Sequence, residues 1–280
     1  MPELPEVETI ARVLRDGSGD TQTSIIGCQV TRAELLWERT LVTPAPGKFQ
    51  ELIAGQTIQS LLRRGKFLVF SLNDLTFLIH LRMSGDMRVE SMLADSSEPK
   101  PFEKHDRLAL EFNNRQRLVF NDTRKFGRAW LVKDPAEVLG GLGPEPFDDL
   151  LTPDTFFNML HGRSRQLKPL LMDQRFIAGL GNIYTDEALH LAKLHPLAVS
   201  GQITHEGSAR LLTAIRGVLS EGIRRNGASI DWVYRGGDFQ NYFNVYGRAG
   251  SPCPVCGTSI ERLVVGQRGT HICPNCQRTA

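Results

Sequence analysis

Four of the five cysteines form two matched pairs near the end of the chain. CPVC is followed by sixteen residues and then by CPNC. Each pair places two thiolates on one turn, and two such turns can complete the tetrahedral shell of four sulfurs that Zn²⁺ accepts. Disulfides or free thiols are the alternatives, but disulfides are rare in cytosolic proteins. The spacing predicts one structural zinc ion with four ligands: Cys253, Cys256, Cys273 and Cys276.

The chain begins MPELPEVE, with two prolines and three glutamates in eight residues. A helix start explains part of this pattern, because Pro5 suits a first helical turn and Glu6 suits the positive end of a helix dipole. An apolar stripe at helical spacing follows. The helix start does not explain Pro2 and Glu3, which therefore remain candidates for chemistry.

Composition indicates an ordinary globular protein. The 280 residues are 41% hydrophobic and 23% charged, which predicts two domains and room for a small third. Neither a membrane span nor a signal peptide is visible, so we expect a cytosolic protein. Residues 57–130 carry thirteen Lys and Arg against nine Asp and Glu, and residues 224–280 carry seven against three. These basic regions suit the two sides of a nucleic-acid groove, although solvated surfaces explain them equally well.

The first half of the chain reads as strands. KFLVFSL and LTFLIHL flank the turn dipeptide Asn73-Asp74, which predicts a hairpin. DRLALEF and RLVFND predict a second hairpin. Antiparallel strands of this kind are typical of a sandwich or a barrel.

Helices are expected after GGLGPEPFDD, a Gly- and Pro-rich boundary at 140–149. Thr152 is a good N-cap with Pro153 at the first helical position, and residues 182–193 and 205–225 show helical periodicity with Gly227 as C-cap. AGLGNIYTDEA lies between two helices. Within the cysteine tail, SIERLVV and THIC predict strands around a tip at 266–269. Arg268 at this tip is either a solvated side chain or a contact to phosphate.

These features together resemble the formamidopyrimidine-DNA glycosylases, bacterial base-excision repair enzymes of the same superfamily as the endonuclease VIII type. The resemblance rests on PELPEVE, the strand-rich first half, GLGNIYTDEAL and the four-Cys finger, in this order. It implies an α+β fold with an N-terminal antiparallel β-sandwich and flanking helix (2–142), a helix-two-turn-helix domain (150–235) and a zinc-finger β-hairpin (244–280). It also implies a cytoplasmic, nucleoid-associated monomer that acts on double-stranded DNA containing oxidised bases or abasic sites.

The resemblance assigns chemistry to the N-terminus. It implies that processing removes Met1 and leaves Pro2 with a free secondary amine. An α-amino group has a pKa of about 7.7–8.0 against about 10.4 for lysine, so a useful fraction is neutral near neutral pH. Such an amine can attack a sugar carbon and form an iminium. Glu3 would shuttle protons, and Glu6 would orient the active centre from the same side of the first helical turn.

Further residues match family positions. Lys66, at the strand start in RRGKFLVF, would hold phosphate and assist proton transfer, and Arg268 would complete this catalytic set. Met83, Arg124 and Phe126 would fill the gap left by a flipped base, whereas the residues alone predict Met83 and Phe126 as core. The remaining DNA contacts are expected at Asn182, which starts a helix, and at His105 and Arg128.

The resemblance defines the type of reaction more closely than it defines the damaged base that is removed. IDWVYRGGDFQNYFNVYGR is a few residues shorter than the loop that caps 8-oxoguanine in the family. The leading prediction is a bifunctional DNA glycosylase and abasic-site lyase that removes formamidopyrimidine and 8-oxoguanine and cuts the strand by β,δ-elimination. An endonuclease VIII-like enzyme for oxidised pyrimidines or hydantoins is the alternative, and PELPE rather than PEGPE favours the first. A non-catalytic zinc-finger protein that binds damaged DNA is a third possibility, and it needs neither Pro2 nor Glu3.

Overall fold

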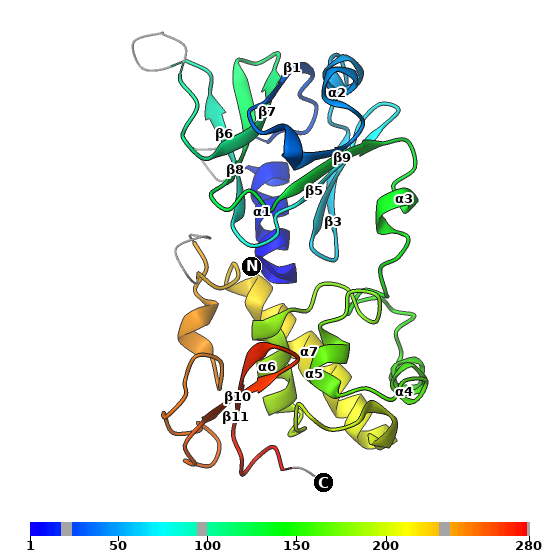
Figure 1. Cartoon of the computed structure of the whole chain (residues 1–280), viewed down its shortest axis with the longest axis vertical. Helices are drawn as coiled ribbons and strands as arrows, with labels where there is room; N and C mark the ends of the chain where they lie inside the picture. The colour runs from blue at the N-terminus through cyan, green and yellow to red at the C-terminus, as the bar shows by residue number, and fades with distance from the viewer. Residues whose placement is uncertain (18–23, 94–99, 230–235, 279–280) are drawn as a thin grey trace. The chain divides into compact units, whose positions relative to one another are not determined.

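The computed structural model describes residues 1–17, 24–93, 100–229 and 236–278 (Figure 1). Its contacts divide the chain into two compact units. The first contains Met1–Pro2, Glu6–Gly140 and Ser229–Arg235, and the second contains Glu3–Pro5, Gly141–Ala228 and Gly236–Ala280. The division at 140/141 falls in the predicted Gly- and Pro-rich boundary. Among the described residues, no helix is long and apolar enough to cross a membrane.

The first unit holds two β-sheets (Figure 1). A four-stranded sheet has the order β1 (Val30–Leu35), β7 (Asp106–Phe112), β8 (Gln116–Asp122), β6 (Gly85–Ser91). A five-stranded sheet has the order β2 (Leu41–Thr43), β9 (Arg128–Val132), β5 (Thr76–His80), β4 (Phe67–Ser71), β3 (Ser60–Arg64). The predicted hairpins are β4–β5 and β7–β8. The pair β2–β9 is parallel, because the long segment between these strands allows the chain to return in the same direction.

One apolar core joins both sheets to the first helix. Helix α1 spans Leu4–Asp16, and its residues Val7 and Leu14 belong to the same buried cluster as Phe70 of β4 and Phe120 of β8. Burying a side chain of this size contributes about 1.5–3 kcal/mol. The apolar stripe that follows the N-terminal glutamates therefore fixes α1 against the sheets. Helix α2 (Pro46–Ile53) adds further buried side chains, and α3 (Ala136–Leu139) follows β9.

Helices form most of the second unit: α4 (Pro153–His161), α5 (Leu167–Leu171), α6 (Asn182–Leu191) and α7 (His205–Arg224). The predicted N-cap of α4 is confirmed, because Thr152 Oγ1 accepts a hydrogen bond of 3.1 Å from Thr155 N. The C-cap of α7 is Arg225 rather than the predicted Gly227. Gly227 lies two residues later with a φ of +79°, and its N–H donates to Gly222 O at 2.7 Å. Only a residue that tolerates a left-handed backbone fits there easily.

The C-terminal part of the second unit is a β-hairpin of β10 (Glu261–Val265) and β11 (Arg268–Ile272), preceded by a short 3₁₀ turn at Phe239–Tyr242. Val265 pairs with Arg268, so the turn consists of Gly266 and Gln267, both with positive φ. A two-residue turn of this kind matches the twist of the flanking strands. The predicted tip at 266–269 is therefore too long. Arg268 is the first residue of β11, although its side chain is exposed as predicted.

Candidate active site and metal centre

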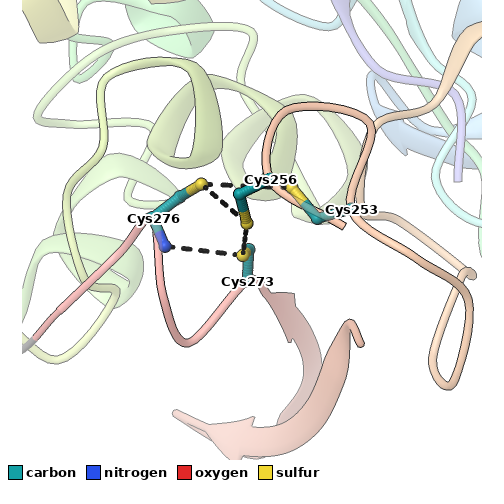
Figure 2. Close-up of side chains that lie close together, drawn as sticks. All are labelled: Cys253, Cys256, Cys273 and Cys276. Atoms are coloured by element: carbon teal, nitrogen blue, oxygen red, sulfur yellow. Dashed lines mark hydrogen bonds between the residues drawn. The ribbon is translucent and has the colours of Figure 1, made fainter. Parts of the chain in front are cut away.

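The four predicted zinc ligands come together in the second unit. Their sulfur atoms all lie within 4.8 Å of one another, and Figure 2 shows the four side chains converging. Cys253 Sγ lies 4.0 Å from Cys276 Sγ, and Cys256 Sγ lies 3.4 Å from Cys273 Sγ. A tetrahedral shell with Zn–S bonds of about 2.3 Å has edges of about 3.8 Å. The geometry fits one zinc ion held by four thiolates.

The pKa values of two of the four thiols also indicate a site for a cation among the sulfur atoms. Hydrogen bonds from the Thr258 and Asn275 side chains lower the pKa of Cys256 to about 5. Burial and the neighbouring sulfurs raise the pKa of Cys276 to about 12. Close thiols resist ionising together, and a bound Zn²⁺ relieves this repulsion because its charge stabilises every thiolate.

Helix α6 holds the finger through polar side chains that the sequence analysis missed. The carboxylate of Glu187 is fully buried and accepts hydrogen bonds of 2.9 Å from the backbone N–H groups of Asn244, Val245 and Tyr246. One turn further, His190 Nε2 lies 3.4 Å from Cys253 Sγ. The signal in the sequence was the run TDEALH, in which two acidic residues and a histidine lie close together on one predicted helix.

The start of α6 meets the first residues of β11. Asn182 Nδ2 donates to Gly269 O at 3.1 Å, and Asn182 Oδ1 is buried without a hydrogen-bond partner among the described residues. Lys168 Nζ donates to the same carbonyl at 3.2 Å and to Asp186 Oδ1 at 2.6 Å. The structure thus brings Asn182 next to the residue that follows Arg268. Asn182 and Arg268, both predicted to contact DNA, therefore lie close together where α6 meets β11.

Lys168 and Asp186 form a fully buried ion pair, which the sequence did not predict. Burial lowers the pKa of Lys168, while the carboxylate of Asp186 opposes that shift. Asp186 Oδ2 also accepts a hydrogen bond of 2.9 Å from His271 N in β11. Removing one partner of such a pair leaves an uncompensated buried charge, so the pair fixes the hairpin on α5 and α6.

Glu3 lies at the beginning of α6, which corrects the predicted arrangement of the two N-terminal carboxylates. Helix α1 begins at Leu4, so Glu3 precedes it and does not share a helical turn with Glu6. Glu3 Oε1 accepts a hydrogen bond of 3.0 Å from Ile183 N. The carboxylate prefers this position because the first N–H groups of a helix carry partial positive charge. Glu3 groups with the second unit, and Glu6 groups with the first.

Of the other residues predicted for the catalytic centre, Pro2, Glu6 and Lys66 lie in the first unit, and Arg268 lies in the second. Pro2, Glu6 and Lys66 are all buried. Lys66 lies in the turn between β3 and β4, directly before the first residue of β4. Burial, together with the charges of Arg82 and Lys66, lowers the pKa of His80 to about 3. A neutral His80 therefore lies near the charge of Lys66.

Residues expected to fill the gap of a flipped base lie on two turns. Met83 is half-buried on the turn between β5 and β6, and Arg124 and Phe126 lie on the turn between β8 and β9. Phe126 is 48% exposed, and the Arg124 guanidinium lies 5.2 Å from its ring centroid. The assignment of Phe126 to the core, which its residue type alone suggested, is wrong.

The two remaining predicted DNA contacts have intramolecular partners. His105 Nδ1 lies 3.2 Å from Arg107 Nη2. Arg128 Nη1 donates to the carbonyl groups of Lys125, Phe126 and Gly127, at 3.3, 3.2 and 2.9 Å. Arg128 therefore helps to close the turn that carries Phe126. The predicted capping loop cannot be placed, because residues 230–235 lie outside the described part of the chain.

Three family models match successive parts of the chain. The formamidopyrimidine-DNA glycosylase N-terminal domain matches residues 1–129, the H2TH domain of the same enzymes matches 142–233, and the zinc finger found in FPG and IleRS matches 250–279. Among curated proteins, formamidopyrimidine-DNA glycosylase of Protochlamydia amoebophila is 43% identical, with 99% of this chain and all of that protein covered. The protein of the same name from Chloroflexus aurantiacus is 45% identical, with 100% and 98% covered.

Solved structures agree with these matches. MutM in complex with DNA containing carbocyclic 8-oxo-G superposes with a TM-score of 0.89 at 36% identity, covering 99% of this chain and 100% of that one. Fpg from Lactococcus lactis bound to DNA with an abasic site gives a TM-score of 0.88 at 35% identity, with the same coverage. The predicted α+β fold and zinc finger are confirmed. The chain belongs to the formamidopyrimidine-DNA glycosylase family, which makes it a DNA-repair glycosylase.

Proposed function

We propose that the protein excises oxidised purines from duplex DNA and then cuts the strand at the resulting abasic site. The observation that carries this mechanism is the position of Glu3. The residue directly after the proposed nucleophile is buried, and its carboxylate is held by Ile183 N at the start of α6. A purely DNA-binding protein has no need for a fixed carboxylate at this position. Relatives solved with 8-oxo-G, Fapy-dG and abasic DNA support the lesion class.

The proposed reaction begins after removal of Met1. The secondary amine of Pro2 attacks C1′ of the damaged nucleotide, the glycosidic bond breaks, and the base leaves with the bonding electrons. Ring opening gives an iminium, with Glu3 supplying a proton to the sugar oxygen. Loss of a proton from the neighbouring carbon expels the 3′-phosphate, and a second elimination expels the 5′-phosphate. Hydrolysis then releases Pro2.

The DNA would be held from both units. Lys66, Asn182 and Arg268 would bind phosphates, and Met83, Arg124 and Phe126 would replace the extruded nucleotide in the stack. His105 and Arg128 would make further polar contacts to the DNA. The bound zinc ion would keep the four cysteines together, so that the β10–β11 hairpin presents Arg268 in a fixed position. We also propose the three-part division at 2–142, 150–235 and 244–280, a monomeric enzyme, and a cytoplasmic, nucleoid-associated location.

Borohydride trapping tests the mechanism. The mature protein is incubated with duplexes containing 8-oxoguanine, a formamidopyrimidine, dihydrouracil or an abasic site, reduced, and analysed for a covalent adduct. We expect an adduct that maps to Pro2 and forms more slowly in Pro2→Gly, which keeps only a primary amine, and in Glu3→Gln. An N-terminal tag that blocks Pro2 should abolish strand cleavage and leave binding intact, and unchanged cleavage by the tagged protein would contradict the mechanism.

The same experiment separates the alternatives. An adduct that forms fastest with dihydrouracil would favour endonuclease VIII-type substrates. Binding of lesion duplex without an adduct on any substrate would favour the non-catalytic zinc-finger protein.

A further inference from the structure

The two turns expected to enter the DNA stack are joined through the buried hydroxyl group of Ser84. Met83 lies on the first turn, directly before Ser84, and Arg124 and Phe126 lie on the second, directly after β8. The Ser84 hydroxyl donates to Asp122 Oδ1, the last residue of β8. Both side chains are buried. Two turns that are 38 residues apart in sequence thus share a link that solvent does not reach.

Asp122 also fixes both ends of the second turn. Its Oδ1 accepts a hydrogen bond of 3.1 Å from Arg124 N, and its Oδ2 accepts one of 2.7 Å from Gly127 N. Ser84 Oγ accepts from Arg124 N as well, at 3.1 Å. A carboxylate that accepts several N–H and O–H bonds holds them more strongly than a neutral acceptor does. Residues 123–126 are exposed between these two anchored ends.

The backbone around Asp122 is held as firmly as its side chain. Asp122 N donates to His105 O at 2.9 Å, and the buried Arg107 donates from Nε to Asp122 O at 2.8 Å. Every polar atom of Asp122 therefore has a partner.

Packing leaves the turns little room to shift. A Cβ atom on Gly127 would lie 2.2 Å from Cζ of Phe120, and one on Gly85 would lie 2.7 Å from Cε2 of the same ring. Gly85 follows Ser84 directly, so both turns lie against one buried ring. Lys125, between Arg124 and Phe126, has a left-handed φ of +61°, which only a well-determined turn maintains.

We propose that Asp122 and Ser84 are positioning residues for base extrusion. They fix the turn of Met83 and the turn of Arg124 and Phe126 relative to each other, so that the three side chains enter the same gap together. Extruding a base costs stacking energy, and side chains offset that cost only where they arrive in register with the gap. This inference rests on the proposed function, because it requires that the three side chains replace a flipped nucleotide.

Two variants weaken the link in different ways. Asp122→Asn replaces one carboxylate oxygen by an NH₂ group, which cannot accept a hydrogen bond. This group then faces either Gly127 N–H or the two donors at Oδ1, which are Ser84 O–H and Arg124 N–H. Ser84→Ala removes both hydrogen bonds of the Ser84 hydroxyl but keeps the two from Arg124 N and Gly127 N to Asp122. Ser84→Thr retains the hydroxyl. Asp106→Asn is the matched control, because Asp106 is an equally buried carboxylate in β7 whose partners include Arg88 and Asn121 rather than either turn.

Two measurements distinguish insertion of the three side chains into the DNA stack from formation of the covalent adduct. Fluorescence of 2-aminopurine placed beside the lesion reports unstacking, and borohydride trapping is timed on an abasic site in duplex and in single-stranded DNA. A single strand leaves no gap to fill. We expect Asp122→Asn to slow adduct formation in the duplex by about tenfold or more and to reduce the fluorescence change. The single strand should react at the wild-type rate, Ser84→Ala should follow in the same direction, and Ser84→Thr and Asp106→Asn should resemble wild type.

Two results would overturn the inference. One is a folded Asp122→Asn protein with wild-type fluorescence and duplex rate, and the other is an equal slowing on duplex and single strand. If Asp122→Asn does not fold, Ser84→Ala decides by the same two criteria. Failure of the wild-type protein to form any adduct would count against the proposed chemistry instead, and the fluorescence change would still test the positioning role.

Discussion

Glu3 Oε1 accepts a hydrogen bond from Ile183 N, although 180 positions separate the two residues. Leu4 N also donates to Gly179 O at 3.1 Å, so the segment that follows Pro2 is bound to the loop before α6. These contacts explain why glycine occupies positions in the GLGN stretch, residues 179–182. Gly181 lies against the Glu3 side chain, where a Cβ atom would be 2.3 Å from Glu3 Cδ.

We therefore expect Gly181→Ala to impair the reaction by displacing Glu3. Gly181 has a φ of −136°, which alanine also adopts, so the effect is steric rather than conformational. The rate of adduct formation should fall by about tenfold or more, and adding Glu3→Gln should cause little further loss. Gly217→Ala is the control, because a Cβ atom there would meet nothing within 4 Å among the described atoms. A wild-type rate in Gly181→Ala would show that the carboxylate need not occupy this position.

Cys273→Ser should release zinc and weaken DNA binding. Loss of one thiolate opens a closed four-sulfur shell, and the hairpin that carries Arg268 then loses its fixed base. Metal content per protein and affinity for lesion duplex measure the two effects. Cys28→Ala, which changes a buried cysteine outside the cluster, should retain zinc. Stoichiometric zinc in Cys273→Ser would contradict the ligand assignment.

His190 should slow the loss of zinc, since its Nε2 lies 3.4 Å from Cys253 Sγ. An N–H donor stabilises a coordinated thiolate, and removing such a partner typically lowers metal affinity by about 10–100-fold. We expect His190→Phe to release zinc to a competing chelator faster by a factor in that range, and His190→Gln to fall between the two proteins. Identical release from His190→Phe and wild type would show that the contact is packing alone.

Acid should destabilise the first unit by protonating two largely buried carboxylates, Glu90 and Asp106. With their partners Arg88, Lys100 and Arg117 they form a charge cluster. Burial by itself would raise the pKa of Glu90, but hydrogen bonds from Lys100, Arg88 and Arg117 outweigh it and lower the pKa. Burial likewise opposes the hydrogen bond from Arg88 that lowers the pKa of Asp106. A lowered pKa in the folded state means stability that is present above the unfolded pKa of about 4 and lost as the pH falls through the folded value.

Arg117→Met tests this cluster, because it removes a buried partner of Glu90. At neutral pH the free energy of unfolding should fall by about 3 kcal/mol, and the difference from wild type should shrink as the pH falls through the lowered pKa of Glu90. Arg210→Met breaks the exposed pair with Glu206 and should cost less than about 1 kcal/mol. Urea unfolding at several pH values measures both variants, and a pH-independent loss in Arg117→Met would assign its role to packing.

The sequence by itself determined the features that depend on neighbouring residues. The cysteine spacing predicted the ligand set, two apolar runs around Asn73-Asp74 predicted a hairpin, and Thr152-Pro153 predicted a helix start. Each signal lies within a few residues, because local hydrogen bonding and periodicity produce these elements. The resemblance then supplied roles for residues such as Pro2, which composition and spacing could not assign.

Only the tertiary structure decided where buried charges and distant turns meet. It placed the Glu3 carboxylate at the start of α6, paired Lys168 with Asp186, and joined Ser84 to Asp122. Buried carboxylates and ammonium groups must find partners to offset the loss of water, and those partners come from whichever segment the fold brings close. Sequence distance carries no information about that choice, and the local pattern therefore predicted the elements of this protein but not the contacts that position its proposed active site.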